Sequence, residues 1–362
     1  MGSVADTHAV RRDKLRVLAR ETGVEGVLVT QLVNVRYLTG FTGSNAALLV
    51  SDRVTVLATD GRYTIQAQRE SPDLEHVIER ACAPALIARA ATDTLRTLAF
   101  ESEHLSVATH ARLLRLDPVP YLLPLAGAVV GLRVVKDERE LALLRAACAI
   151  GDRALRELWH WVGPGMTERD IARRLEATMI DLGADGLAFD TIVASGPNSA
   201  VPHHQPSERE IERGDFLTVD FGALYRGYHA DCTRTVVVGR EPAQWQSDTY
   251  DLVRRAQRAG REALSVGADL RAVDAAARDV VVAAGEAEHF PHGLGHGVGL
   301  EIHEAPMLAT TSTGRLLART PVTVEPGVYL PGRGGVRIED TLVVGEDGPE
   351  LLTTTPKDLL VL

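Results

Sequence analysis

The second half of the chain carries four acidic side chains inside segments that otherwise have the pattern of buried strands or tight turns. Asp220 stands in the run FLTVDFG, and Asp231 follows eleven residues later, shortly before a run of three valines. Glu325 interrupts VTVEPGV, and Glu339 lies in GVRIED. An ionised carboxylate in such apolar surroundings must be paired or must bind a metal. The fold is therefore expected to bring these groups together at one site.

A histidine completes a set of ligand types that suits divalent metals. His296 lies in GLGHGVG. Four carboxylates and one imidazole favour Mn(II), with Co(II), Fe(II) and Zn(II) as alternatives. Four negative charges exceed what one divalent ion neutralises, so two ions that share bridging carboxylates fit better. Such a pair can activate a water and polarise a carbonyl, which predicts hydrolytic chemistry. The alternating glycines around His296 match neither a dinucleotide fingerprint nor a phosphate loop.

A hairpin is expected to place two of the acids face to face. The segment between Asp220 and Asp231 turns near residues 225–227. With a two-residue loop, we expect the two aspartates to form a cross-strand pair with Cβ atoms roughly 5 Å apart. Two like charges that close would repel each other without a cation between them. The alternative is that these are surface carboxylates at strand ends.

The composition limits the number of domains, the kinds of partner and the cellular setting. The chain has 362 residues, 45% of them hydrophobic, which favours two domains. A net charge of -10 without a basic cluster argues against nucleic acid as a partner. Cys82, Cys148 and Cys232 form no CxxC pair, so we expect buried free thiols in a reducing compartment. The first eight residues lack the apolar core of a signal peptide, and no apolar run reaches about 18 residues, so a cytoplasmic protein without a membrane span is expected.

The first third of the chain alternates helical and strand patterns. A helix is expected around Arg11–Arg20 and strands at 26–30 and 97–100. Residues 46–50 and 54–58 are expected to form a hairpin. This alternation predicts an α/β domain with a mixed sheet.

The domain boundary is expected near residues 131–136, which gives domains 1–132 and 133–362. Asp137 is a suitable N-cap for the helix that follows, with Glu140 completing a capping pair. A second helix is expected from Thr167 to Leu182, and two more span about 247–265 and 270–284. The overall class is then α+β, with helices outside a curved antiparallel sheet that carries the ligands.

Five ordered segments resemble those of the pita-bread metallopeptidases of family M24. They are VDFG at 219–222, DCTRT at 231–235, GLGHGVG at 293–299, VEPG at 324–327 and RIED at 337–340. Within that family the chain is similar to the Xaa-Pro peptidases, meaning aminopeptidase P and prolidase. Residues 34–45 resemble the creatinase-like N-terminal domain of prolidases; as an alternative, this segment is a turn-rich connection between two strands.

The resemblance assigns the metal ligands one by one. Asp220 chelates one ion, Asp231 and Glu339 bridge both ions, and His296 and Glu325 bind the second ion. Glu325 is also the proton shuttle. The metal is expected to be manganese, and the activity hydrolysis of the Xaa-Pro bond after the N-terminal residue of peptides or dipeptides.

The resemblance also names groups on the substrate side. His203, directly after a proline, and His303 match two histidines that hold the scissile carbonyl or the tetrahedral intermediate. His204 is an alternative to His203. Arg337 is expected to orient Glu339 or to bind the far end of the substrate. His292 is expected either to contact the metal ligands without binding a metal itself or to lie at the surface.

Two other functions stay open beside the peptidase. One is a metal-free, creatinase-like amidinohydrolase, and the other is a non-catalytic pita-bread module that binds proteins. The intact ligand set weighs against both.

A homodimer is implied by the resemblance. Some prolidases carry an arginine four residues after the histidine that matches His303; here that residue is Met307, which leaves substrate length open.

Overall fold

The computed structural model describes residues 4–362. Met1–Ser3, part of the segment on which the expected absence of a signal peptide rests, lie outside the described residues. The chain divides into two compact units, Met1–Arg133 and Val134–Leu362. No helix in the described part of the chain combines the length and hydropathy of a membrane span.

The first unit is built on one six-stranded mixed sheet in the order β4-β3-β2-β1-β5-β6. Strands β1/β2 and β2/β3 pair antiparallel, whereas β1/β5, β3/β4 and β5/β6 pair parallel, so the expected mixed sheet is confirmed. The strands are β1 Gly26–Val29, β2 Ala46–Ser51, β3 Thr55–Thr59, β4 Glu75–Ile78, β5 Thr97–Glu101 and β6 Tyr121–Leu125.

Helices flank these strands. They are α1 Val4–Glu21, α2 Leu32–Thr39, α3 Thr64–Glu70, α4 Cys82–Thr92, α5 Val107–Leu113 and α6 Ala128–Val134. The turn-rich connection considered for residues 34–45 is wrong in its first half, because helix α2 occupies it. The carboxylate of Glu101, in β5, accepts hydrogen bonds from the backbone N–H groups of Thr30 (2.6 Å) and Gln31 (2.8 Å) and so fixes the segment that leads into this helix.

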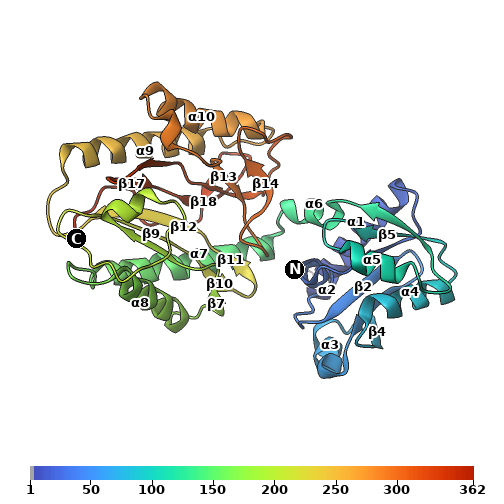
Figure 1. The fold of residues 1–362 in the computed structure, drawn as a ribbon. Coiled ribbons are helices and arrows are strands. Elements are labelled where there is room, and N and C mark those ends of the chain that lie inside the picture. The colour runs from blue at the N-terminus through green and yellow to red at the C-terminus, as the bar shows by residue number, and fades with distance from the viewer. Residues whose placement is uncertain (1–3) are drawn as a thin grey trace. The chain divides into compact units, whose positions relative to one another are not determined.

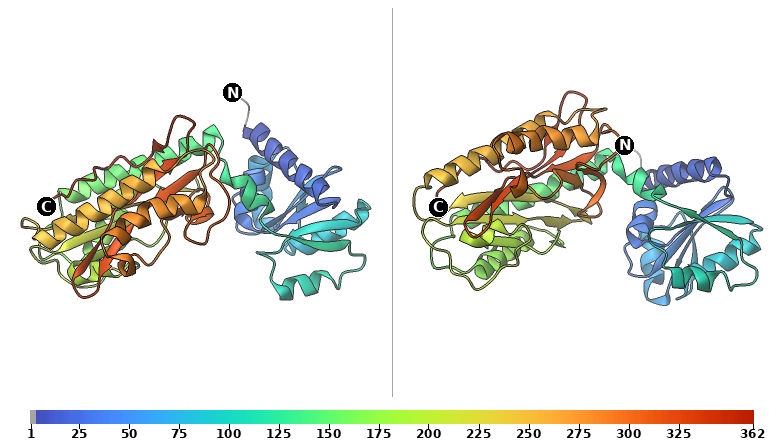
Figure 2. Two further views of the ribbon diagram at one scale, coloured as in Figure 1. Left: turned by 90° about the horizontal axis from the view of Figure 1, so that it is seen from above. Right: turned by 45° about the horizontal axis from the view of Figure 1, so that its top comes forward.

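The second unit has helices on both sides of its strands (Figure 1). Helices α7 Glu138–Trp159 and α8 Glu168–Asp181 lie on one side, and α9 Gln244–Glu262 and α10 Leu270–Ala283 on the other. Asp137 and Glu140 form the expected capping box of α7, and the Thr167 side chain caps α8. Helices α9 and α10 run side by side along the outer face in both views of Figure 2.

The strands of the second unit pair antiparallel in several small sheets. Strands β12-β9-β8 form one sheet, β11-β10-β7 a second, β14-β13-β15-β18-β19 a third and β16-β17 a fourth. Their bounds are β7 Gly186–Leu187, β8 Ile192–Ser195, β9 Phe216–Phe221, β10 Ala223–Tyr225, β11 Tyr228–His229, β12 Cys232–Val237, β13 Gly295–Gly297, β14 Glu304–Leu308, β15 Pro321–Val324, β16 Gly327–Leu330, β17 Gly334–Arg337, β18 Asp340–Val343 and β19 Glu350–Leu351.

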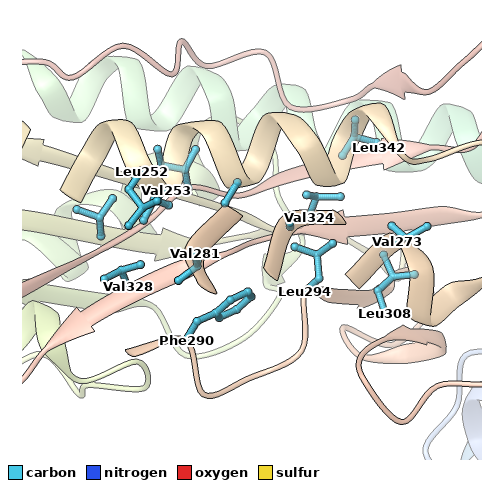
Figure 3. Close-up of a cluster of buried hydrophobic side chains, with 14 of the residues drawn as sticks. Leu252, Val253, Val273, Val281, Phe290, Leu294, Leu308, Val324, Val328 and Leu342 are labelled. Atoms are coloured by element: carbon cyan, nitrogen blue, oxygen red, sulfur yellow. The ribbon is translucent and has the colours of Figure 1, made fainter. Parts of the chain in front are cut away.

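Two hydrophobic clusters hold the helices to these strands. One lies beneath α9 and α10 and includes Val253, Val281, Leu294 and Val324 (Figure 3). The other packs α7 and α8 against β8, β9 and β12. Both clusters consist of buried, mostly aliphatic and aromatic side chains, and full burial of a Val, Leu, Ile or Phe side chain contributes about 1.5–3 kcal/mol. The strands that carry the acidic residues are therefore fixed from both sides.

The hairpin between Asp220 and Asp231 turns where expected but has a different register. The two-residue loop is Arg226-Gly227, and both residues have positive φ (48° and 85°), as hairpin turns of this length require. Asp220 consequently pairs with Thr233, so the expected cross-strand pair with Asp231 is wrong. A turn centred between residues 226 and 227 places the partner of Asp220 two positions beyond Asp231.

Candidate metal centre and active site

All five expected ligands line one cavity of about 980 Å³. Asp220 lies in β9, and Asp231 directly precedes β12. His296 is the middle residue of β13. Glu325 follows β15 and Glu339 precedes β18. The ligands thus come from strands of both halves of the unit.

Three of these residues form the tightest group. The ligand atoms of Asp231, His296 and Glu339 all lie within 4.8 Å of one another, and their residues are 4%, 7% and 1% exposed. His296 Nε2 lies 3.5 Å from Asp231 Oδ2 and 3.4 Å from Glu325 Oε1. His296 Nδ1–H donates to the carbonyl of Gly297 (3.0 Å), which leaves Nε2 as a bare lone pair directed at the carboxylates.

The site holds buried acceptors that no donor satisfies. Asp220 Oδ1 and Glu339 Oε1 are buried and have no hydrogen-bond partner among the described residues. Burial, together with repulsion from neighbouring carboxylates, raises the pKa of Asp231 and of Glu339 well above the ordinary range. Burial raises the pKa of Glu325 to about 8. Such a set of close, buried carboxylates fits divalent ions, whose charge would compensate the carboxylates when they ionise.

Neighbouring hydroxyl groups hold two of the carboxylates. Thr233 Oγ1 donates to Glu339 Oε2 (2.8 Å), and Thr323 Oγ1 donates to Glu325 Oε1 (3.2 Å). Partners of this kind fix the orientation of metal ligands, and their loss commonly weakens metal binding by about 10- to 100-fold.

Arg337 contacts a different carboxylate from the one expected. Its Nη2 donates to Asp220 Oδ2 (2.6 Å), whereas Glu339 is held by Thr233. The same guanidinium donates to Thr233 Oγ1 (3.1 Å), Tyr329 Oη (2.9 Å) and the carbonyl of Pro202 (3.2 Å). With these donors occupied and 3% of the residue exposed, the geometry favours orientation of Asp220 over contact with substrate.

The two expected substrate-side histidines both line the cavity. The rings of His303 and His296 meet edge to face with centroids 4.4 Å apart. His203 is exposed, and no hydrogen bond within the described part of the chain holds its ring. His204 also lines the cavity, but its Nε2–H donates to Glu168 Oε2 (2.7 Å). The ring of His203 is therefore the freer of the two to meet a ligand.

His292 is linked to the expected ligand Asp220 through the side chains of Tyr329 and Arg337. Its Nε2 accepts from Tyr329 Oη (2.9 Å), and Tyr329 in turn accepts from Arg337. Burial lowers the pKa of His292 to about 4, so the ring is neutral and able to accept. The sequence carried no signal for Tyr329, because a tyrosine in a strand is ordinary.

A buried ionic network lies beside the expected ligand Glu339. Asp340 is fully buried and accepts from Arg234 Nη2 (2.7 Å) and Lys357 Nζ (2.8 Å). Arg234 also donates to the carbonyls of Glu339 and Thr355. These contacts join residues 355–357 to strand β18, which directly follows Glu339.

Comparisons with known proteins show the family of the chain. Residues 142–346, more than half of the chain, match the model of metallopeptidase family M24, and residues 11–135 match the creatinase/prolidase N-terminal domain. The chain therefore belongs to metallopeptidase family M24, as the sequence motifs predicted, and its two-part α+β architecture is the expected one.

Several relatives match over almost their full length. An uncharacterized peptidase, YqhT, from Bacillus subtilis is 39% identical over 98% of this chain and 100% of its own. An Xaa-Pro dipeptidase from Bacillus anthracis is 38% identical with a TM-score of 0.94, covering 98% of this chain and 100% of that one. An X-Pro aminopeptidase from Thermotoga maritima is 37% identical with a TM-score of 0.89, covering 97% and 99%.

Proposed function

We propose that this chain is a dinuclear-metal Xaa-Pro peptidase that removes the N-terminal residue preceding a proline. One observation carries the proposal: buried carboxylate oxygens without donors and the bare Nε2 of His296 converge on a cavity large enough for a peptide. The names of the two solved relatives support the proline preference. Residues 1–132 would form the N-terminal domain and residues 133–362 the catalytic domain.

Each expected ligand has a role in this proposal. Asp220 would hold one ion, Asp231 and Glu339 would be shared by both, and His296 and Glu325 would hold the second. When bound, the two ions supply Lewis acidity and an activated water. Mn(II) is the metal that a mainly oxygen-donor set of this kind favours.

The remaining chemistry falls to side chains that line the cavity. His303 and His203 donate hydrogen bonds to the oxygen of the scissile carbonyl, where negative charge develops. Glu325 takes the proton released by the attacking water and passes it to the proline nitrogen, which leaves as an amine. The free amine of the substrate binds on the Asp220 side, which limits cleavage to one residue.

Substrate length depends on what meets the carboxyl end of the peptide. Met307 lines the cavity and pairs in register with His296. Its neutral side chain cannot hold a dipeptide carboxylate, so a continuing peptide chain fits this wall as well as a dipeptide does. The three free, buried cysteines favour a reducing, cytoplasmic setting. We further propose a homodimer, on the family resemblance alone.

The decisive experiment is hydrolysis of Ala-Pro, Ala-Pro-Ala and Ala-Ala-Ala by the purified protein, first with Mn(II) and then with chelator. Chelator-sensitive cleavage of Ala-Pro alone identifies a prolidase, and cleavage of Ala-Pro-Ala identifies an aminopeptidase P. Equal cleavage of Ala-Ala-Ala contradicts the proline preference. Two bound ions without any cleavage contradict the peptidase and favour the binding module, and metal-independent cleavage of creatine favours the amidinohydrolase.

A further inference from the structure

One buried carboxylate lies outside the metal site and organises the segment that carries His203. Glu168 is the first residue of helix α8 and is 0% exposed. The segment 195–207 leaves strand β8, forms a short 3₁₀ turn at Gly196–Ala200 and then reaches His203. An isolated buried carboxylate is costly unless several donors satisfy it.

Six donors from the segment 195–207 converge on Glu168. Its Oε1 accepts from Ser195 N (2.7 Å), Ser195 Oγ (2.8 Å) and Asn198 Nδ2 (2.9 Å). Its Oε2 accepts from His204 Nε2 (2.7 Å), Ser207 N (3.0 Å) and Ser207 Oγ (2.6 Å). Both ends of the segment, and the residue next to His203, are thus fixed to one side chain.

The hydrogen bonds keep this carboxylate charged. Burial alone would raise the pKa of Glu168, but the donors outweigh burial and lower the pKa to about 2. Hydrogen bonds to a charged acceptor are stronger than those to a neutral one, so the segment is held firmly at neutral pH.

The opposite side of the segment is fixed to the metal site. Ser199 Oγ accepts from the backbone N–H of Gly335 in β17 (2.9 Å). Arg337 donates both to the carbonyl of Pro202, directly before His203, and to the ligand Asp220. The backbone of His203 therefore lies between a carboxylate on α8 and a guanidinium that also orients a metal ligand.

We propose that Glu168 is a positioning residue that sets the place of the His203 imidazole relative to the metal ligands, acting through His204 and the backbone of residues 195–207. The inference rests on the proposed function only for the role of His203. A misplacement of a catalytic group by about 1 Å can lower a rate about 10²-fold. Loss of the Glu168 carboxylate is therefore expected to lower turnover.

The first test is a double-mutant cycle between Glu168→Gln and His203→Ala. In Glu168→Gln the side-chain NH₂ group must face a backbone N–H group, either that of Ser195 or that of Ser207, and these donors cannot rotate. We expect kcat/KM for Ala-Pro to fall about 10- to 100-fold, with a larger effect on kcat than on KM. Metal content should stay at the wild-type value. In the His203→Ala background the same change should cost less than about 3-fold.

Equal losses in both backgrounds would overturn the inference, as would loss of activity only in proportion to loss of metal. Glu157→Gln, an exposed glutamate on α7, is the matched control and should leave kcat/KM unchanged. If Glu168→Gln does not fold, Ser207→Ala removes one donor to the same carboxylate and enters the same cycle with a smaller expected loss.

Hydrogen exchange separates this inference from the peptidase assignment. The amides of Ser195 and Ser207 donate to Glu168, so Glu168→Gln should accelerate exchange in residues 195–207 and leave the strands of the metal ligands protected. Unchanged exchange there would overturn the positioning role. A wild-type protein that cleaves no peptide would overturn the proposed function alone, since the exchange result does not depend on activity.

Discussion

Arg337 Nη2 lies 2.6 Å from Asp220 Oδ2, so the arginine two residues before one expected ligand orients another expected ligand on a distant strand. Both groups are almost fully buried. Removal of one partner from a buried ion pair leaves an uncompensated charge, which makes such pairs sensitive to substitution of either side.

The first prediction concerns this pair. Arg337→Met should lower the free energy of unfolding of the metal-free protein by about 3–5 kcal/mol, because Asp220 loses its counter-charge. Urea denaturation in chelator measures the change, and added Mn(II) should recover part of it. The exposed Arg139→Met serves as control and should stay within about 0.5 kcal/mol of wild type. An Arg337→Met protein as stable as wild type would contradict the role assigned to the pair.

The second prediction concerns the bridging carboxylates. Asp231→Ala and Glu339→Ala each remove a group that would bind both ions, so hydrolysis of Ala-Pro should fall below about a tenth of the wild-type rate even in excess Mn(II). Steady-state assays with metal analysis of the same samples measure this. Turnover above that level in either variant would refute the ligand assignment, while the exposed Asp181→Ala should behave as wild type.

The third prediction is a pH dependence of the metal-free protein. The pKa values of Asp231 and Glu339 are raised well above 3.8 and 4.5, and that of Glu325 to about 8, so the native chain binds more protons than the unfolded chain as pH rises from 4.5 to 8. Stability must then fall with pH. His296, with its pKa lowered to about 4, acts in the opposite direction only up to its ordinary value of 6.5.

The window from pH 6.5 to 8 therefore isolates the carboxylates. The thermal midpoint in chelator should decrease across this window, and Glu325→Gln should reduce the slope. Saturating Mn(II) should abolish the decrease, because the ion binds the deprotonated ligands. A midpoint that rises in chelator between pH 6.5 and 8 would show that these groups are already ionised without metal.

The fourth prediction concerns substrate length. Met307 is 47% exposed and lines the cavity, so Met307→Arg should place a cation where the carboxylate of a dipeptide can reach it. The kcat/KM ratio of Ala-Pro over Ala-Pro-Ala should rise about 10-fold, the effect of about 1.4 kcal/mol of added binding. Met307→Leu is the neutral control. An unchanged ratio would mean that another group already holds the carboxylate.

The gathering of the acidic residues at one cavity could be predicted from sequence, because buried carboxylates are costly in apolar surroundings. The charge of an acid such as Asp220 or Glu339 in an apolar segment must be compensated, and a shared cation would compensate it. The first residues of two helices could also be predicted, because Asp137 and Thr167 cap α7 and α8 through hydrogen bonds that depend on local sequence alone.

Register and partners could not be predicted in the same way. The facing residue of Asp220 depends on which two residues form the hairpin loop, and a shift by one position in the turn moves the partner by two. Glu168 resembles any acidic residue in the first turn of a helix, where the dipole favours one. Only the fold brings the donors of residues 195–207 onto it.

The spread of the ligands along the chain has a consequence for the living cell. Asp220 lies in β9 and Glu339 directly precedes β18, so ions bound to both would close a long loop and act as a reversible cross-link. Ions that bind only the native chain stabilise it by mass action, and proteases remove chains that open. The cell's supply of metal would then govern how long each copy of the protein survives, as well as how fast it works.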